Sequence, residues 1–168
     1  ALQIGHRAGM PNQNLLAVDQ AGHIGWTVTG AIPRYDDRDQ WLAQDEVPVL
    51  LDPPEGIAWT ANNRIVGGRA LALLGDGGYD GPQRAASIRD DLRARVQAAP
   101  YLNERDLLAV QLGDRAAHLD RWRDLLLQVL ADDARWAKEP AALALRDEVR
   151  DWQGHASIDS AGYRLVRE

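Results

Sequence analysis

Asn14-Leu-Leu-Ala-Val-Asp19 and His23-Ile-Gly-Trp-Thr-Val-Thr-Gly30 are the two runs of sequence that decide the fold. Three residues, Gln20-Ala21-Gly22, join them, and a short connection containing glycine between two apolar runs predicts a β-hairpin. In the second run the apolar side chains alternate with glycine and threonine, so Trp26 and its apolar neighbours share one face. The alternation predicts a sheet with a core beneath it.

A third run, Ile57-Ala-Trp-Thr-Ala-Asn62-Asn63-Arg64, follows the turn Pro53-Pro-Glu-Gly56. Its alternation predicts a further strand. The run ends in two asparagines, residues that leave β geometry readily for a turn or a left-handed conformation. Side-chain amides delivered at the end of a strand would suit an oxyanion hole, which stabilises charge on a carbonyl oxygen. The alternative from these residues alone is that the asparagines only form a turn.

The segments around these runs are less regular. Residues 31–45 are polar and predict a surface loop, and Pro48 confines residues 46–52 to a sheet edge or an irregular segment. The run Gly75-Asp-Gly-Gly-Tyr-Asp-Gly81 predicts a loop that lacks the Lys and Ser/Thr of a phosphate-binding loop. A flexible connection into a helix and a cation-binding loop both fit its composition.

The chain changes character near residue 82, with strands and loops in residues 1–81 and helices in residues 82–153. Pro82 suits a helix start, and apolar residues recur every fourth position over 84–98. Asn103 with Asp106 predicts the cap of a second helix. Apolar spacing from Leu119 to Leu130 predicts a third, and a fourth runs from Pro140 to before Gly154, followed by a tail over 154–168.

The bulk properties predict an incomplete α+β fold. The 168 residues carry a net charge of −6 and 45% hydrophobic residues, which is typical of a globular protein and not of a general nucleic-acid binder. An apolar run of 18 residues is missing, so no membrane span is predicted. Two strands and one extra segment are few for four helices, and we expect part of the fold to lie outside this chain. The opening Ala1-Leu-Gln-Ile4 also suggests a processed or excised piece.

Few residues in the chain are of the types and spacings that carry out catalysis or bind a metal. The chain has no cysteine, its four histidines lack metal-ligand spacing, and no serine lies in a Gly-x-Ser-x-Gly elbow. Arg84 at the mouth of a helix is a further candidate, and the alternative is an ordinary surface residue of that helix. The residues alone therefore predict an anion-stabilising amide without a nucleophile.

The order of motifs resembles the β chain of penicillin acylases. The hairpin, the following Thr29-Gly-Ala-Ile-Pro33 and the approach Thr60-Ala-Asn-Asn63 are similar to that family's route to its oxyanion asparagine. The likeness continues through Gly81-Pro-Gln-Arg84 to Trp152-Gln-Gly154 and Ser160-Ala-Gly-Tyr163, nearly the whole chain.

The resemblance implies a fragment of an N-terminal-nucleophile hydrolase, an αββα sandwich produced by precursor cleavage. Such an enzyme transfers an acyl group from a small-molecule amide to an N-terminal serine and then to water. Asn62 matches the oxyanion asparagine, with Asn63 shaping the bend, and Arg84 matches the arginine that supports it. The partners would be the α chain and the first part of the β chain. The resemblance also implies a periplasmic or secreted location.

The departures from the family pattern are specific. Ala1 is not a nucleophile, so the fragment should be inactive alone. The family's structural calcium site has an acidic residue where this chain has Leu73, and the Pro33 carbonyl with Asp76, or with Asp80, would be the remaining calcium ligands. Ala61 stands where some members have Trp. The rival hypothesis is a non-catalytic domain that keeps the fold for packing or subunit contact; a ligand-binding module with exposed tryptophans has no motif behind it.

Overall fold

The computed structural model describes residues 2–35, 37, 39–99 and 101–168. Ala1 therefore lies outside the described residues. The chain forms two compact units, the first ending at Ala98 and the second running from Ala99 to Glu168. The first unit is α+β and the second is helical, and each has a small core of its own.

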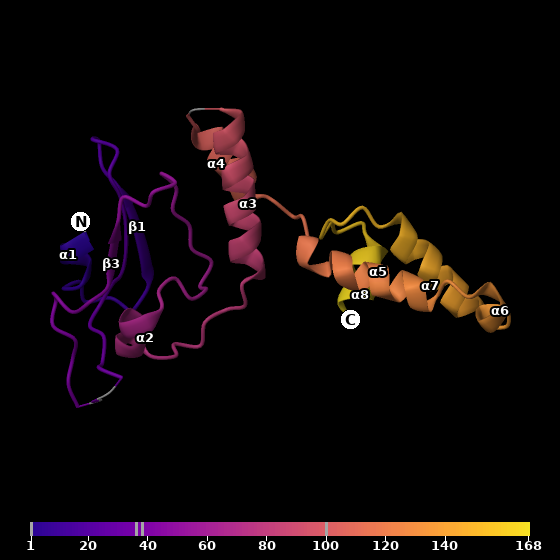
Figure 1. Cartoon of the computed structure of the whole chain (residues 1–168), viewed down its shortest axis with the longest axis horizontal. Helices are drawn as coiled ribbons and strands as arrows, with labels where there is room; N and C mark the ends of the chain where they lie inside the picture. The colour runs from indigo at the N-terminus through magenta and orange to yellow at the C-terminus, as the bar shows by residue number, and fades with distance from the viewer. Residues whose placement is uncertain (1, 36, 38, 100) are drawn as a thin grey trace. The chain divides into compact units, whose positions relative to one another are not determined.

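The first unit is built on a three-stranded antiparallel sheet in the order β1-β2-β3 (Figure 1). Strand β1 spans Asn14–Val18, β2 spans Ile24–Val28 and β3 spans Val49–Leu51. The first two strands form the predicted hairpin, with Leu16 opposite Trp26. Strand β3 lies at an edge, as expected after Pro48, which has no N–H for a ladder.

The two faces of the sheet are covered differently. On one face the short helix α1 (Leu2–Gly5) lies so close that a Cβ on Gly25 would stand 2.5 Å from the Leu2 side chain. On the other face Leu16, Trp26 and Leu50 are aligned across the three strands. Residues 57–65 lie against that second face, because Ile57, Trp59 and Ile65 line a pocket together with these three side chains.

The prediction that residues 57–61 form a strand is wrong. These residues have no regular secondary structure, and the segment is bounded by residues with left-handed backbones, Asp52 (φ 45°), Gly56 (φ 65°) and Asn62 (φ 59°). Alternating side chains need a partner edge to form a ladder. Here the segment instead packs onto the face of the sheet, and its apolar side chains are half-buried there.

Two helices complete the first unit. Helix α2 (Gly68–Leu74) was not predicted, and its Leu73 and Leu74 pack on a buried cluster of Ile32, Leu42 and Val47. Helix α3 (Gln83–Ala98) confirms the prediction from apolar spacing after Pro82. Helix α3 belongs to the first unit because its arginines bond to residues 55 and 61 of the preceding segment.

The second unit is helical. Its elements are α4 (Glu104–Gln111), η1 (Ala117–Leu119), α5 (Asp120–Val129), α6 (Asp133–Trp136), α7 (Pro140–Asp151) and α8 (Ala161–Arg167). The predicted cap of α4 is confirmed, since Asn103 and Asp106 form a reciprocal capping box. The predicted helices over 119–130 and from Pro140 correspond to α5 and α7. The tail contains a helix, α8, that periodicity did not reveal.

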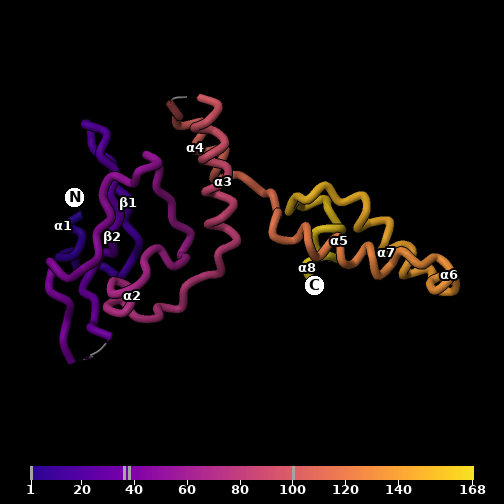
Figure 2. Tube along the Cα trace, viewed as in Figure 1, coloured from indigo at the N-terminus to yellow at the C-terminus, as the bar shows by residue number. Residues whose placement is uncertain are grey.

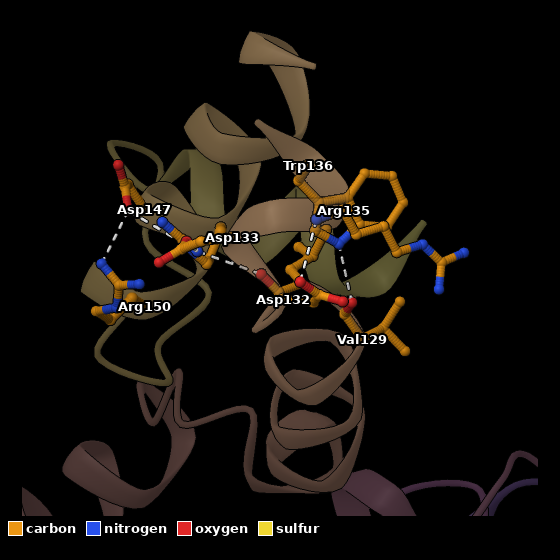
Figure 3. A network of polar contacts seen from close by, with 9 residues as sticks. Val129, Asp132, Asp133, Arg135, Trp136, Asp147 and Arg150 are labelled. Carbon is orange, nitrogen blue, oxygen red and sulfur yellow. Dashed lines mark hydrogen bonds and ion pairs between the residues drawn. The ribbon is translucent and has the colours of Figure 1, made fainter. Parts of the chain in front are cut away.

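The core of the second unit is centred on Trp152. Ala116, Leu119 and Trp152 are buried together, and Tyr163 and Val166 of α8 pack on them. Figure 3 shows the polar contacts that fix the short helix α6, where Asp132 accepts from the Arg135 N–H at 3.1 Å and the Trp136 indole donates to the Val129 carbonyl at 3.1 Å. These contacts are structural.

The described fold leaves much apolar surface uncovered. The accessible surface is 11875 Å², whereas two separate compact units of these sizes would expose about 9,900 Å². Large side chains contribute, including Val18, Trp41, Leu51 and Leu112, each more than 60% exposed. Among the described helices, none is both long and apolar enough to cross a bilayer.

Candidate functional site

The two asparagines play different structural roles. The Asn63 side chain closes the bend, because its Oδ1 accepts from the Ala61 N–H at 3.1 Å and its Nδ2 donates to the Arg64 carbonyl at 3.0 Å. Asn62 has a left-handed backbone, with φ at 59°. Its side chain is exposed and bonds to none of the described residues. Asn62 therefore presents an unused amide.

Both peptide groups that flank the Cα of Asn62 are held by hydrogen bonds. The Arg84 guanidinium donates to the Ala61 carbonyl at 3.1 Å, and the Asp80 N–H donates to the Asn62 carbonyl at 2.9 Å. The same guanidinium pairs with the Asp80 carboxylate at 2.6 Å. Because the two peptide planes are fixed, the direction of the Asn62 Cα–Cβ bond is fixed as well. The structure thus brings Asn62 and Arg84, both singled out from the sequence, into one network.

Asp80 is a member of this network that the sequence did not assign to it. We expected Asp80 only as a substitute calcium ligand. Its carboxylate is engaged by Arg84, and its backbone N–H by Asn62. The spacing of four residues between Asp80 and Arg84, across the start of α3, was the available signal.

Asn62 lines a cavity of about 830 Å³. Apolar side chains from the sheet and α2 form part of its wall, and polar side chains from the loops form the rest. The residues used below are Asn62, Tyr35, Asp76, Tyr79 and Asp80. A cavity of this volume accommodates a drug-sized molecule.

Two tyrosines flank this cavity, and the sequence gave no indication of either. Gly75 (φ 72°) lies under the Tyr35 ring, where a Cβ would come within 2.2 Å of the ring. The Tyr79 hydroxyl donates to the Gly75 carbonyl at 3.2 Å. Burial, and secondarily the Asp76 carboxylate, raises the pKa of Tyr79, so its hydroxyl stays a donor at neutral pH. Gly75 therefore organises both rings.

A second, smaller pocket of about 280 Å³ is also lined by the asparagine bend. It is formed between the sheet face and residues 57–65, and its lining is mainly apolar. Trp26, Asn63 and Ile65 line both cavities. The bend that carries Asn62 consequently borders both a larger, partly polar cavity and a smaller, mainly apolar one.

The predicted calcium ligands fit such an ion incompletely. Pro33 and Asp76 both line the larger cavity, but one Asp76 oxygen already accepts from the Gly78 N–H at 3.1 Å. Leu73 packs on the apolar cluster of the first unit, and Asp80 is paired with Arg84. Calcium takes six to eight oxygens. Within the part of the chain that the structure describes, no three acidic or histidine side chains gather to supply them.

A comparison with protein-family models matches residues 2–168 to the model described as penicillin amidase. The chain belongs to the penicillin amidase family.

Comparison with a curated relative shows how similar the two sequences are and how much of each chain is matched. The chain is 26% identical to the penicillin acylase 2 proenzyme of Pseudomonas sp. (strain SE83), over 90% of its own length. It spans about one-fifth of the length of that relative, since the match covers 20% of it. The penicillin amidase family is hydrolytic, and the relative's name marks it as a precursor.

Among its described residues this chain shows no serine in a nucleophile arrangement. Ser87 donates to the Gln83 carbonyl within α3, and Ser160 caps α8. Ser157 accepts from the Asp159 N–H. None of the three is bonded to a histidine in the described structure, so the site on this chain consists of hydrogen-bond donors and cavity walls.

Proposed function

We propose that this chain forms part of an amide hydrolase of the N-terminal-nucleophile type, in which Asn62 donates its side-chain amide to the oxyanion. The reaction transfers an acyl group from an amide to a serine outside residues 1–168 and then to water. The proposal includes the αββα sandwich and a periplasmic or secreted location, both from the family likeness. By itself the fragment turns over no substrate.

The observation that carries the proposal is the fixed geometry of Asn62 beside a large cavity. Hydrogen bonds to Arg84 and Asp80 hold the peptide groups on either side of its Cα. An oxyanion donor contributes most when it is oriented before the reaction and needs no rearrangement. The unbonded amide of Asn62, a residue that lines the cavity, meets that condition.

Arg84 supports Asn62 in this proposal and does not itself bind the oxyanion. Its guanidinium is engaged by the Ala61 carbonyl and the Asp80 carboxylate. Both hydrogen bonds leave from one terminal nitrogen, Nη2, so the guanidinium ties the Ala61 carbonyl to the Asp80 carboxylate. The role of Arg84 is therefore to fix the backbone from which the Asn62 amide projects.

The test is the substitution Asn62→Ala in the full-length protein that contains this chain. Removal of one oxyanion donor costs roughly 10²–10³-fold in kcat. Gln97→Ala is the control, because this amide is exposed on α3 and no described contact involves it. Hydrolysis of an amide substrate by Asn62→Ala at the parental rate would refute the proposal.

The second candidate is a contact domain without catalysis, and the uncovered apolar surface favours it. Val18 is 74% exposed and Leu51 64% exposed, both at the ends of strands. The two candidates differ in one observation. The enzyme requires a Ser, Thr or Cys released as a new N-terminus elsewhere in the precursor, which N-terminal sequencing of the mature protein detects.

Calcium has no part in the proposed chemistry. Asp76 and the Pro33 carbonyl would contribute at most a few of its ligands, and any such site would be completed by residues outside the described chain. Its role would be structural, so no step depends on it.

A further inference from the structure

Residues 53–61, which lead to Asn62, are held by few backbone contacts. Before them the Asp52 N–H donates to the Ile24 carbonyl at 2.8 Å, and after them the Asp80 N–H donates to Asn62. Between these two points the described backbone N–H groups bond only locally, as in the turn bond from Gly56 to Pro53. Without a β-ladder, side chains must set the position of this segment.

One side chain of the segment makes a two-point ion pair with α3. The Arg93 guanidinium donates to both carboxylate oxygens of Glu55, from Nε at 2.7 Å and from a terminal nitrogen at 2.5 Å. The pair lowers the pKa of Glu55, mainly through the hydrogen bond from Arg93. A planar fork of this kind constrains distance and orientation together, which a lysine would not do.

The segment therefore has two attachments to the same helix. Arg93 holds Glu55, and Arg84 holds the Ala61 carbonyl. The two arginines are nine residues apart, about 13.5 Å along a helix axis, and six residues of chain can span at most about 20 Å. Because the later residue of the segment meets the earlier arginine of the helix, the segment runs antiparallel to α3. Figure 2 traces it between the strands and that helix.

We propose that Glu55 and Arg93 are positioning residues for Asn62. Arg84 fixes the near end of the segment and the Glu55–Arg93 pair fixes its far end, so that the segment cannot slide along α3. The inference rests on the proposed function of Asn62. Because both side chains are roughly half exposed, the pair contributes little to global stability. Its effect lies in geometry, where an error of about 1 Å costs up to about 10²-fold in rate.

The experiment uses the full-length protein with Glu55→Gln and, separately, Arg93→Lys, which keeps the charge but loses the fork. We expect kcat to fall by about three- to tenfold while KM and the melting temperature stay near parental values. Asp91→Asn is the matched control, since Asp91 pairs with Arg95 on the same helix without touching the segment. The exchange Glu55→Arg with Arg93→Glu should recover part of the lost kcat.

A cycle with Asn62→Ala separates positioning from a purely structural role. If the pair acts through Asn62, Glu55→Gln should lower kcat in the parent and leave it unchanged in the Asn62→Ala background. An equal loss in both backgrounds, or no loss in the parent, overturns the positioning role. Failure of the proposed function is a distinct result, because Asn62→Ala alone would then keep the parental rate.

Discussion

Arg84 donates a hydrogen bond of 3.1 Å to the carbonyl oxygen of Ala61, the residue immediately before Asn62. The contact joins the first turn of α3 to the bend that carries the candidate oxyanion donor. Since the same guanidinium binds Asp80, whose N–H binds the Asn62 carbonyl, the contacts close a circuit of four residues around the Asn62 Cα.

Arg84→Lys should reduce kcat in the full-length protein by about tenfold, which corresponds to ~1.4 kcal/mol of transition-state stabilisation. Both bonds come from the terminal nitrogen Nη2, which lies one bond farther from the backbone than a lysine ammonium, so a lysine keeps the charge but loses the reach. Steady-state kinetics measure the effect. Arg69→Lys on α2 is the control, because Arg69 is exposed and no described contact involves it. Unchanged kcat in Arg84→Lys would contradict the supporting role.

The stability of the first unit should fall as the pH is lowered below about 6.5, the ordinary pKa of histidine. His6 is buried, and its Nε2 lies 2.7 Å from the Thr27 hydroxyl, which itself donates to the Pro48 carbonyl at 2.8 Å. Burial lowers the pKa of His6, and its Nδ1 has no described hydrogen-bond partner.

The sign of this dependence follows from proton binding. Above pH 6.5 His6 is neutral in both states, and below it the unfolded chain takes up a proton that the folded chain does not. The free energy of unfolding therefore decreases until the pH reaches the lowered folded pKa. Urea unfolding at pH values between about 5 and 8 measures this free energy. His6→Gln should flatten the His6 part of the curve, whereas His118→Gln, at an exposed residue, should leave it unchanged.

Gly75→Ala should destabilise the first unit and displace Tyr35 from the larger cavity. The backbone at Gly75 has φ at 72°, and a Cβ would stand 2.2 Å from the Tyr35 ring. With ψ at −169° the backbone lies in a region that essentially only glycine adopts, which costs another residue about 1–3 kcal/mol, and the clash adds to it. Gly77→Ala is the matched control, since its Cβ would meet only Tyr79 at 4.0 Å. Equal melting temperatures for the two variants would contradict the prediction.

Local patterns predicted most of the secondary structure. The hairpin of β1 and β2 and the helices α3, α4, α5 and α7 follow from apolar spacing, turn residues and caps, which act within a few residues of the chain. Helix α2 was not predicted because glycines bound it on both sides, at Gly67-Gly68 and at Gly75. Helix α8 was also not predicted, because it is short and lies in residues 154–168, which we expected to form a tail.

Contacts between distant residues were not predictable. The alternation over 57–61 was genuine, but whether such a segment pairs at a sheet edge or packs on a sheet face depends on partners elsewhere in the fold. The same holds for the Arg84 contact with Ala61, 23 residues away, and for Glu55 with Arg93, 38 residues away. The sequence thus predicted Asn62 and Arg84 as candidates, and the structure added the circuit that connects them.

The left-handed backbone of Asn62 has a consequence for how this position can change over evolutionary time. Two demands fall on one residue, because the bend selects for Gly, Asn or Asp while the proposed chemistry selects for a neutral amide. Only asparagine satisfies both at low cost. A relative that has abandoned hydrolysis but kept the fold should therefore carry glycine or aspartate here first, a signature readable in sequences alone.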